Sequence, residues 1–348
     1  MFFNRKKEKK SFSSANWFFD FMSGNKFSAA NHQEFIDFYI QACPVFTATK
    51  LIADAVSSIE IILRDKNTGA IIPQKTLHPS LALLRKPNAF TNGKLFLNEL
   101  ASFDILTGNS FINIVKGSNG KDIIELQNFN PKNISIDSDS KGFAGAYRYQ
   151  SSVESITFQR QSDGSYQSPN GNELCHFREF NPNFSSSNLW GSSTFIGCQL
   201  EIMQYIAASV HNHALLKNGA RPSGMMTYEG DDGLSQEQAD AIRKGIKDKL
   251  SGAANAGEPM FLSGKFKWQQ LSESVKDMDF GGLKKATAEA IYSAAKIPLP
   301  MVSPDNMSFA NMDASKYMFY DNAVLPVLKK ILSFLTEKVL SKYKDAAN

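Results

Sequence analysis

The segment STFIGCQLEIMQYIAASVHNHALLKN, residues 193–218, decides the fold of this chain because it has the pattern of one long helix with almost no charge. Between Phe195 and Lys217 the only charged side chains are those of Glu201 and Lys217. A helix of about 25 residues is about 38 Å long, and on a monomer its outer face would normally carry charged residues. The pattern therefore predicts a long helix whose outer face packs against other helices.

The apolar residues of this helix form one broad stripe at helical spacing. The centre of the stripe consists of Ile196, Leu200, Met203, Ala207 and Val210. Ala214 extends the stripe, and the residues that widen it are Phe195, Ile202, Ile206 and Leu215. Gly219 and Pro222 are expected to end the helix. We expect the five central residues to be the packing contacts of the helix.

A small α/β insert follows the long helix, over residues 223–272. It opens with a strand and continues with a helix that starts at a capping box, Ser235 to Gln238. A hairpin with its tip at Ser263-Gly264 closes the insert. The chain then returns as a helix over about 280–296.

Residues 297–312 show no periodicity, and an irregular segment of this length between two helices is more often functional than idle. A last helix is expected over about 313–343. Pro326 lies within it, lacks a backbone donor and should kink it.

The residues before the long helix predict a mixed region. Helices are expected over 44–59, with Pro44 in the first turn, and from a cap at Thr91 to a stop at Gly108-Asn109. A short helix should end before Pro87, and a hairpin should turn at Gly69. Six strands are expected between 110 and 177, with the sequences SFINIVK, DIIELQN, NISID, GAYRYQ, SITFQR and ELCHF.

The charge of this chain is concentrated at its start. The whole chain has 38 basic and 34 acidic residues, and the first ten residues hold five basic ones and one acidic one, which leaves 33 of each. A protein that grips a duplex tightly usually presents a concentrated basic surface, which this neutral body lacks. The basic arm is either a solvated tail or a contact with nucleic acid, an acidic partner or a membrane surface. The start has no cleavage pattern of a signal peptide, and no apolar run approaches the roughly 18 residues of a membrane helix.

Several kinds of chemical site are excluded by residue spacing. Cys43, Cys175 and Cys198 are widely separated, which favours a reducing compartment over a disulfide framework or a zinc site. His211 and His213 lie two apart on a helix and do not face one metal ion. Cys175 and His176 are neighbours on a strand, so they point to opposite faces and form no dyad. No phosphate-binding glycine loop occurs, so no cofactor, metal ion or catalytic residue is expected and the chain is not expected to be an enzyme.

Seven segments resemble the portal proteins of tailed bacteriophages, in order and over about 250 residues. They are HPSLALLRKPN, FLNELASFDILTGNSFINI, FNPKNISI, NLWGSSTF, ALLKNGARPSGMM, GEPMFLSGKFKWQQL and AIYSAAKIPLPMV. No single segment is specific, but the seven in register make coincidence a poor explanation. The resemblance implies an α+β, ring-forming portal fold with a mixed α/β wing, a two-helix stem flanking a small α/β clip, and a kinked C-terminal helix.

The resemblance also implies a division of the chain. Residues 1–30 correspond to a flexible basic and aromatic arm and residues 31–190 to the wing. The stem is expected over 191–219 and 273–296, on either side of a clip at 220–272. Residues 297–312 correspond to the tunnel loop, and 313–348 to the kinked helix that returns to the wing, with little or no crown.

The function implied is that of a structural subunit in a dodecamer-like ring at the capsid vertex of a virion, assembled in the cytoplasm of a bacterial host. Such a ring conducts double-stranded DNA during packaging and ejection. The implied partners are other copies of the chain, the DNA, the terminase large subunit, a head–tail adaptor, and the major capsid or scaffold protein, with no membrane. Two alternatives stay open: a monomeric nucleic-acid-binding module that uses the basic arm, and a nucleic-acid-processing enzyme of a phage or prophage.

Two sets of candidate contact residues follow from the resemblance. The DNA-facing tunnel loop would use Met301, Ser303, Asn306, Ser308 and Asn311, with Lys316 just beyond, and the alternative is an ordinary surface loop. The candidates for partner docking in the clip are Arg243, Lys244, Lys247, Lys265, Lys267 and Trp268. Because alternate strand residues point to opposite faces, Phe266 and Trp268 are expected to pack while the neighbouring lysines face solvent, as an alternative to a platform for single strands.

Overall fold

The computed structural model describes residues 32–65, 68–71, 78–117, 119–120, 122–185, 188–217, 224–230, 235–250, 265–270, 280–303 and 309–343. The expected arm at 1–30 and the hairpin tip at 263–264 lie outside these residues. The chain divides into two compact units, one comprising Ala30–Ile202 with Lys285–Asn348 and the other including Met203–Lys284. The C-terminal helix therefore belongs to the same unit as the sheet.

Three helices pack together in the larger unit: α2 (His32–Gln41), α3 (Cys43–Ser58) and α5 (Gly93–Thr107). Helix α3 has Pro44 in its first turn and buries the stripe that predicted it, including Ile52 and Val56. Helix α2 was not predicted, although it buries Phe35 and Phe38 against the other two. A shorter helix, α4 (Pro79–Arg85), ends before Pro87 as expected.

The cap of α5 differs from the prediction by one residue. The side chain of Asn92, not that of Thr91, accepts a hydrogen bond from the Leu95 backbone N–H at 2.8 Å. Thr91 instead donates its backbone N–H to the side chain of Asn88 at 2.8 Å, which places it in the preceding turn. The predicted stop is confirmed, because Gly108 follows the helix in the left-handed conformation with φ +66°.

A seven-stranded antiparallel sheet follows α5, in the spatial order β2-β1-β7-β6-β5-β4-β3. Its strands are β1 (Asn109–Lys116), β2 (Ile123–Phe129), β3 (Ile134–Ser138), β4 (Ala144–Gln150), β5 (Ser155–Arg160), β6 (Tyr166–Gln167) and β7 (Glu173–Arg178). All six predicted strands are confirmed. Strand β6 is only two residues long, too short for an alternating pattern to reveal it.

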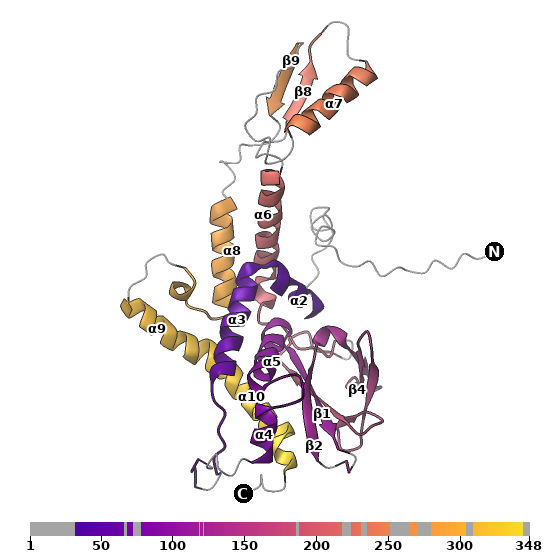
Figure 1. Ribbon diagram of the computed structural model, residues 1–348, viewed down its shortest axis with the longest axis vertical. Coiled ribbons are helices and arrows are strands. Elements are labelled where there is room, and N and C mark those ends of the chain that lie inside the picture. The colour runs from indigo at the N-terminus through magenta and orange to yellow at the C-terminus, as the bar shows by residue number, and fades with distance from the viewer. Residues whose placement is uncertain are drawn as a thin grey trace, which may run out of the picture. The chain divides into compact units, whose positions relative to one another are not determined.

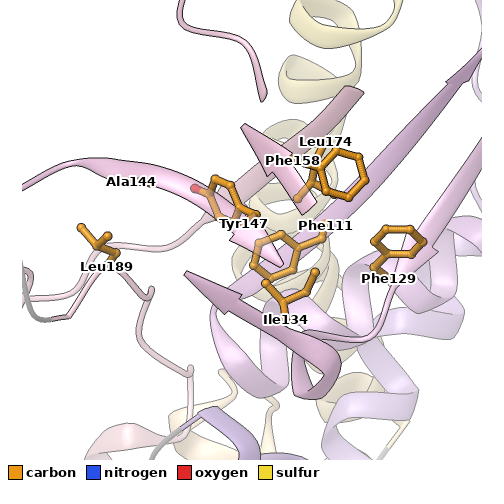
Figure 2. Packing of buried hydrophobic residues seen from close by; sticks show 8 residues of the cluster. All are labelled: Phe111, Phe129, Ile134, Ala144, Tyr147, Phe158, Leu174 and Leu189. Carbon is orange, nitrogen blue, oxygen red and sulfur yellow. The ribbon is translucent and has the colours of Figure 1, made fainter. Parts of the chain in front are cut away.

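One face of this sheet holds an aromatic core (Figure 2). Its buried residues are Phe111, Phe129, Ile134, Ala144, Tyr147, Phe158, Leu174 and Leu189. Since six of the strands contribute to it, residues as far apart in sequence as 111 and 174 meet in one cluster. Helix α5 packs against β1 and β2, so it joins this sheet to the helical layer.

Between α3 and α4, the predicted hairpin is reduced to a single bridge between Arg64 and Ile71 among the described residues. Gly69 has φ +67°, as the turn was expected to require.

The long helix predicted over 193–218 is α6 (Gln199–Lys217), and it starts six residues late. A single 3₁₀ turn, Ile196–Cys198, precedes it. Gly197 lies in that turn, and glycine is among the poorest helix formers. The returning helix is α8 (Phe280–Ala294), close to the predicted 280–296.

The smaller unit contains an α/β element between these two helices. Strands β8 (Gly224–Tyr228) and β9 (Phe266–Gln270) pair antiparallel, and α7 (Gln236–Leu250) lies between them in sequence (Figure 1). The predicted capping box is confirmed, since the Gln238 N–H donates to Ser235 Oγ and the Ser235 N–H donates to Gln238 Oε1. Phe266 is half-buried against Tyr228, whereas Lys265 and Lys267 are exposed, as the alternation predicted.

The C-terminal helix begins earlier than predicted and consists of two parts. A 3₁₀ turn, Leu299–Met301, precedes α9 (Phe309–Phe319). A π-helical turn, Tyr320–Val324, joins α9 to α10 (Leu325–Lys338), and a 3₁₀ turn, Leu340–Lys342, follows. The π turn ends two residues before Pro326 and interrupts the α-helical hydrogen-bond pattern there, and the kink at Pro326 stays a prediction.

Candidate channel site

The start of α6 is fixed to the sheet by two glycines in close contact. A Cβ on Gly108 would lie 2.1 Å from the Ser192 carbonyl oxygen, and a Cβ on Gly191 would lie 2.1 Å from the Gly108 carbonyl oxygen. Only glycine fits at either position. The two glycines lie within two of the segments quoted above, FLNELASFDILTGNSFINI and NLWGSSTF.

The side chain of Asn109 holds the same junction together through hydrogen bonds. Its buried amide donates to the carbonyls of Thr107 at 2.6 Å and Gly191 at 3.3 Å, and its Oδ1 accepts the Gly191 N–H at 2.6 Å. Thr194 donates its N–H to the Ile105 carbonyl at 3.1 Å. The polar groups of the segment entering α6 are therefore paired with α5 and β1, which sets the starting point of the helix.

His176 completes this junction from β7. Its Nε2 lies 3.1 Å from Asn109 Oδ1 and its Nδ1 lies 3.0 Å from the Tyr147 hydroxyl. Its ring stacks on Phe111 with a centroid distance of 4.2 Å. Burial lowers the pKa of His176 to about 3, so the ring is neutral at physiological pH. Neighbouring Cys175 lies on the other face of the strand with its Sγ toward Glu173, which confirms that the two residues form no dyad.

The apolar stripe of α6 divides into a covered and an uncovered part. Ile202 is 0% exposed and Ile206 is buried, whereas Leu200 is exposed and Val210 is 55% exposed. Ile196, in the turn before the helix, is also exposed, and Met203 and Ala207 are half-buried. Of the five residues predicted to be packing contacts, Ile196, Leu200 and Val210 are therefore exposed in the single chain.

The candidate tunnel-loop residues fall in three different settings. Met301 and Ser303 are half-buried at the end of the 3₁₀ turn. Asn306 and Ser308 lie outside the described residues. Asn311 is exposed in the first turn of α9, and exposed Lys316 lies one turn further on, with Nζ 3.7 Å from Asp313. Helix α9 begins at Phe309, within the segment 297–312 that was expected to be irregular.

Helix α10 and the turn after it lie along β7, with contacts that recur at regular intervals. Residues on one face of a strand recur every two positions, about 6.7 Å apart, and residues on one face of a helix recur about every four positions, about 6.0 Å apart. Lys330 donates to Glu179, Phe334 lies 5.1 Å from Phe177 between ring centroids, and Lys342 donates to Glu173. The contacts therefore run from Glu179, just after β7, to Glu173, with Lys338 near Cys175 between them, and the last contact comes from Lys342 in the 3₁₀ turn after α10. Nothing in the sequence pattern indicated this pairing.

Lys330 also reaches a buried carboxylate. Its Nζ lies 3.8 Å from Oδ2 of Asp104, which is 2% exposed, and Oδ1 of Asp104 has no hydrogen-bond partner among the described residues. Burial raises the pKa of Asp104 to about 6, and the Lys330 charge opposes this increase. The ammonium group therefore links α10 to both α5 and the end of β7.

The docking candidates of the smaller unit lie largely on its exposed surface. Arg243 and Lys244 are exposed on α7, and Arg243 pairs with Asp240 at 3.0 Å. Lys267 lies 3.9 Å from Glu229, across the strand pair. The side chains of Lys247 and Trp268 are outside the described part of the chain.

Two further features bear on the class of site. Across the described residues, no group of three or more His, Cys, Asp or Glu side chains is placed to hold a metal ion. No helix in that part of the chain is long and apolar enough to span a membrane.

Comparison with known proteins identifies relatives over most of the chain. An uncharacterized protein of Rickettsia bellii is 29% identical over 306 residues, which cover 85% of this chain and 74% of the relative. The structure of the neck of a native gene transfer agent particle, computed with C12 symmetry, contains a chain that is 26% identical with a TM-score of 0.59. That match covers 95% of this chain and 87% of the other.

The fold itself also matches a more distant structure. An HK97 family phage portal protein from Corynebacterium diphtheriae has a TM-score of 0.60 at 12% identity, covering 86% of this chain and 88% of that one. The model of the family described as phage portal protein matches residues 44–347. Proteins of this family are structural and not enzymatic. With the sheet, the long helices and the family model in agreement over most of its length, the chain belongs to the phage portal protein family.

Proposed function

We propose that this chain is the structural subunit of a portal ring at the capsid vertex of a virion, which conducts double-stranded DNA during packaging and ejection. The observation that carries this proposal is the uncovered stripe on α6, where Leu200 and Val210 are exposed on a helix with almost no charge. Copies of α6 packed side by side would bury these side chains. Family membership and the C12 neck of a similar protein favour a ring over a dimer.

The dimensions of such a ring suit DNA. Packed helices lie about 8–10 Å apart, so about twelve copies of α6 would stand on a circle about 38 Å across. Subtracting one helix diameter of about 10 Å leaves a bore of about 28 Å, which is wide enough for a B-form duplex. A body with balanced charge would hold phosphates weakly, as passage of the duplex requires.

The segment before and within α9 is the proposed contact with DNA. Met301, Ser303, Asn311 and Lys316 would present polar groups and one positive charge to the bore, together with Asn306 and Ser308. The exposed basic residues of the smaller unit, Arg243 and Lys244 with Lys265 and Lys267, would dock the terminase large subunit and then a head–tail adaptor. The major capsid or scaffold protein would hold the ring in the shell.

The test is the solution mass of the full chain by light scattering, followed by negative-stain imaging. We expect rings with an axial hole and a mass near about twelve subunits. Leu200→Glu and Val210→Glu should prevent assembly, because each places a charge in the helix contact. Val153→Glu is the control, since Val153 is the same residue type as Val210 and is also exposed but lies in the turn between β4 and β5. A compact dimer that buries α6, or rings that tolerate both glutamates, would overturn the proposal.

A further inference from the structure

Helix α9 and the π turn that follows it carry aromatic side chains that are exposed to solvent. Among its described side chains from 311 to 319, only Ser315 and Phe319 are buried. Tyr317 is 73% exposed, and Met318 and Tyr320 are exposed beside it. An isolated helix of 11 residues is marginal in water, and α9 is continuous with the packed helix α10 at one end only, so a further surface would stabilise it.

A second exposed apolar surface lies at the corner between α2 and α3. Ile40 is 78% exposed at the end of α2, and Phe46 is exposed on the first turns of α3. Tyr39 lies against Phe46 with a centroid distance of 5.0 Å, which makes the two rings one surface. Cys43 is also exposed here, as a free thiol.

The two surfaces belong to different helices of the same compact unit. In Figure 1, α9 extends to one side of α3 and α2 to the other. Because neighbours in a cyclic ring are related by rotation, each contact joins two different surfaces of the chain. Two different apolar surfaces on one compact unit meet that requirement, whereas a single self-complementary patch would produce a dimer.

We infer that the surface formed by Tyr317 and Met318 of α9 and Tyr320 of the π turn packs against the α2–α3 corner, formed by Tyr39, Ile40 and Phe46, of the neighbouring copy in the ring. This inference rests on the proposed function, and it names a second subunit contact separate from α6. The charges at the two surfaces are compatible with it. Asp321 adjoins Tyr320 and has no ion-pair partner among the described residues, and exposed Lys50, which pairs with Asp54 at 3.0 Å, lies one turn from Phe46. Through this contact the neighbouring subunit would also fix the position of each α9 and of the residues before it.

Cys43 provides a direct test. In assembled full-length protein, Tyr317→Cys, Met318→Cys and Tyr320→Cys are made one at a time and oxidised mildly, and covalent multimers are counted on a non-reducing gel. Cys175 and Cys198 are buried and should not react. Since a disulfide requires Cα atoms within about 7 Å, we expect a ladder of linked subunits for at least one variant and its loss when Cys43→Ser is added. Val153→Cys, on an exposed turn elsewhere, should give no ladder.

The failures of the two proposals are distinguishable. Rings that form normally while none of the three cysteines links to Cys43, or while Val153→Cys links equally well, would overturn this contact and leave the portal function standing. Absence of rings in the unmodified chain would overturn the proposed function itself. As a second readout, Tyr317→Glu should raise the protein concentration needed for half-assembly at least about tenfold, with no change in the unfolding midpoint of the monomer.

Discussion

Helices α9 and α10 are consecutive parts of one C-terminal helix, yet they are held in opposite ways. Helix α10 buries Leu328, Ile331, Phe334 and Leu335. It is held to the strand β7 by Lys330 on one side of Phe334 and, in the turn after the helix, by Lys342 on the other. Helix α9 leaves most of its surface in solvent. The difference shows that one part belongs to the core of the subunit, whereas the other is available for contacts outside it.

The boundary between the two parts is the π turn at 320–324. A π turn holds one residue more than an α-helical turn, so the hydrogen-bond ladder is interrupted there. Ala323 and Val324 are buried within the turn, which fixes its base to the core. A change in α10 should therefore alter the stability of the subunit, whereas the same change in α9 should alter assembly alone.

The largest contrast is expected from removing one aromatic ring on each side of the boundary. Phe334→Ala deletes a ring that is 8% exposed and packed on Phe177, and it should lower the free energy of unfolding by about 3 kcal/mol. Tyr317→Ala should change it by less than about 0.5 kcal/mol. Urea unfolding of the monomer measures both. Equal losses would show that α9 is part of the core and would remove the basis of the comparison.

The next contrast concerns the charge that links α10 to the sheet. Lys330→Met leaves Asp104 and Glu179 without their cation, and we expect a loss of about 2–3 kcal/mol because Asp104 is buried. Adding Asp104→Asn should restore part of this loss, since no unpaired charge then remains at that buried site. Lys329→Met, at the adjacent exposed position, serves as the control. If Lys329→Met and Lys330→Met had the same effect in urea unfolding, the ion pairs would have no particular role.

The sequence predicted the helices and strands better than it predicted the contacts between them. Local signals such as Pro44, Gly108 and the Ser235–Gln238 capping box act within a few residues, and the structure confirms each of them. The cap at Asn92 was missed by one position because Thr91 and Asn92 are both good caps, and only the contact of Thr91 with Asn88 distinguishes them.

The candidate site depended on tertiary contacts that no local pattern contains. On α6 the pattern gave a single broad stripe, and only the structure separates buried Ile202 from exposed Val210. Asp104, Glu179 and Lys330 are far apart in sequence, so their meeting could not be inferred from spacing. The contacts between α10 and β7 depend on a similar residue spacing along the helix and along the strand. The periodicity of either element alone does not reveal that match.

A smaller effect is expected from pH. The pKa of Asp104 is raised in the folded chain to about 6, so its contribution to stability is present at low pH and is lost as pH rises through 6. Asp104→Asn lacks this dependence. The free energy of unfolding of Asp104→Asn, relative to that of the unmodified chain, should therefore increase by about 2 kcal/mol between pH 4 and pH 7. Taking the difference between the two proteins removes the contributions of other groups, such as His176. A difference that stays constant with pH, or falls, would contradict the assignment.

The smallest effect is expected at Pro326 itself. Since the π turn precedes it, the proline lies in the first turn of α10, where a missing N–H and a fixed φ are tolerated. Pro326→Ala should therefore cost only about 0.5–1 kcal/mol, through the greater freedom of the unfolded chain. It should leave the helical signal in circular dichroism unchanged. If instead the alanine variant gained both helicity and stability, the proline would be the cause of the interruption, and the separation of α9 from α10 would rest on one residue and not on the buried base of the π turn.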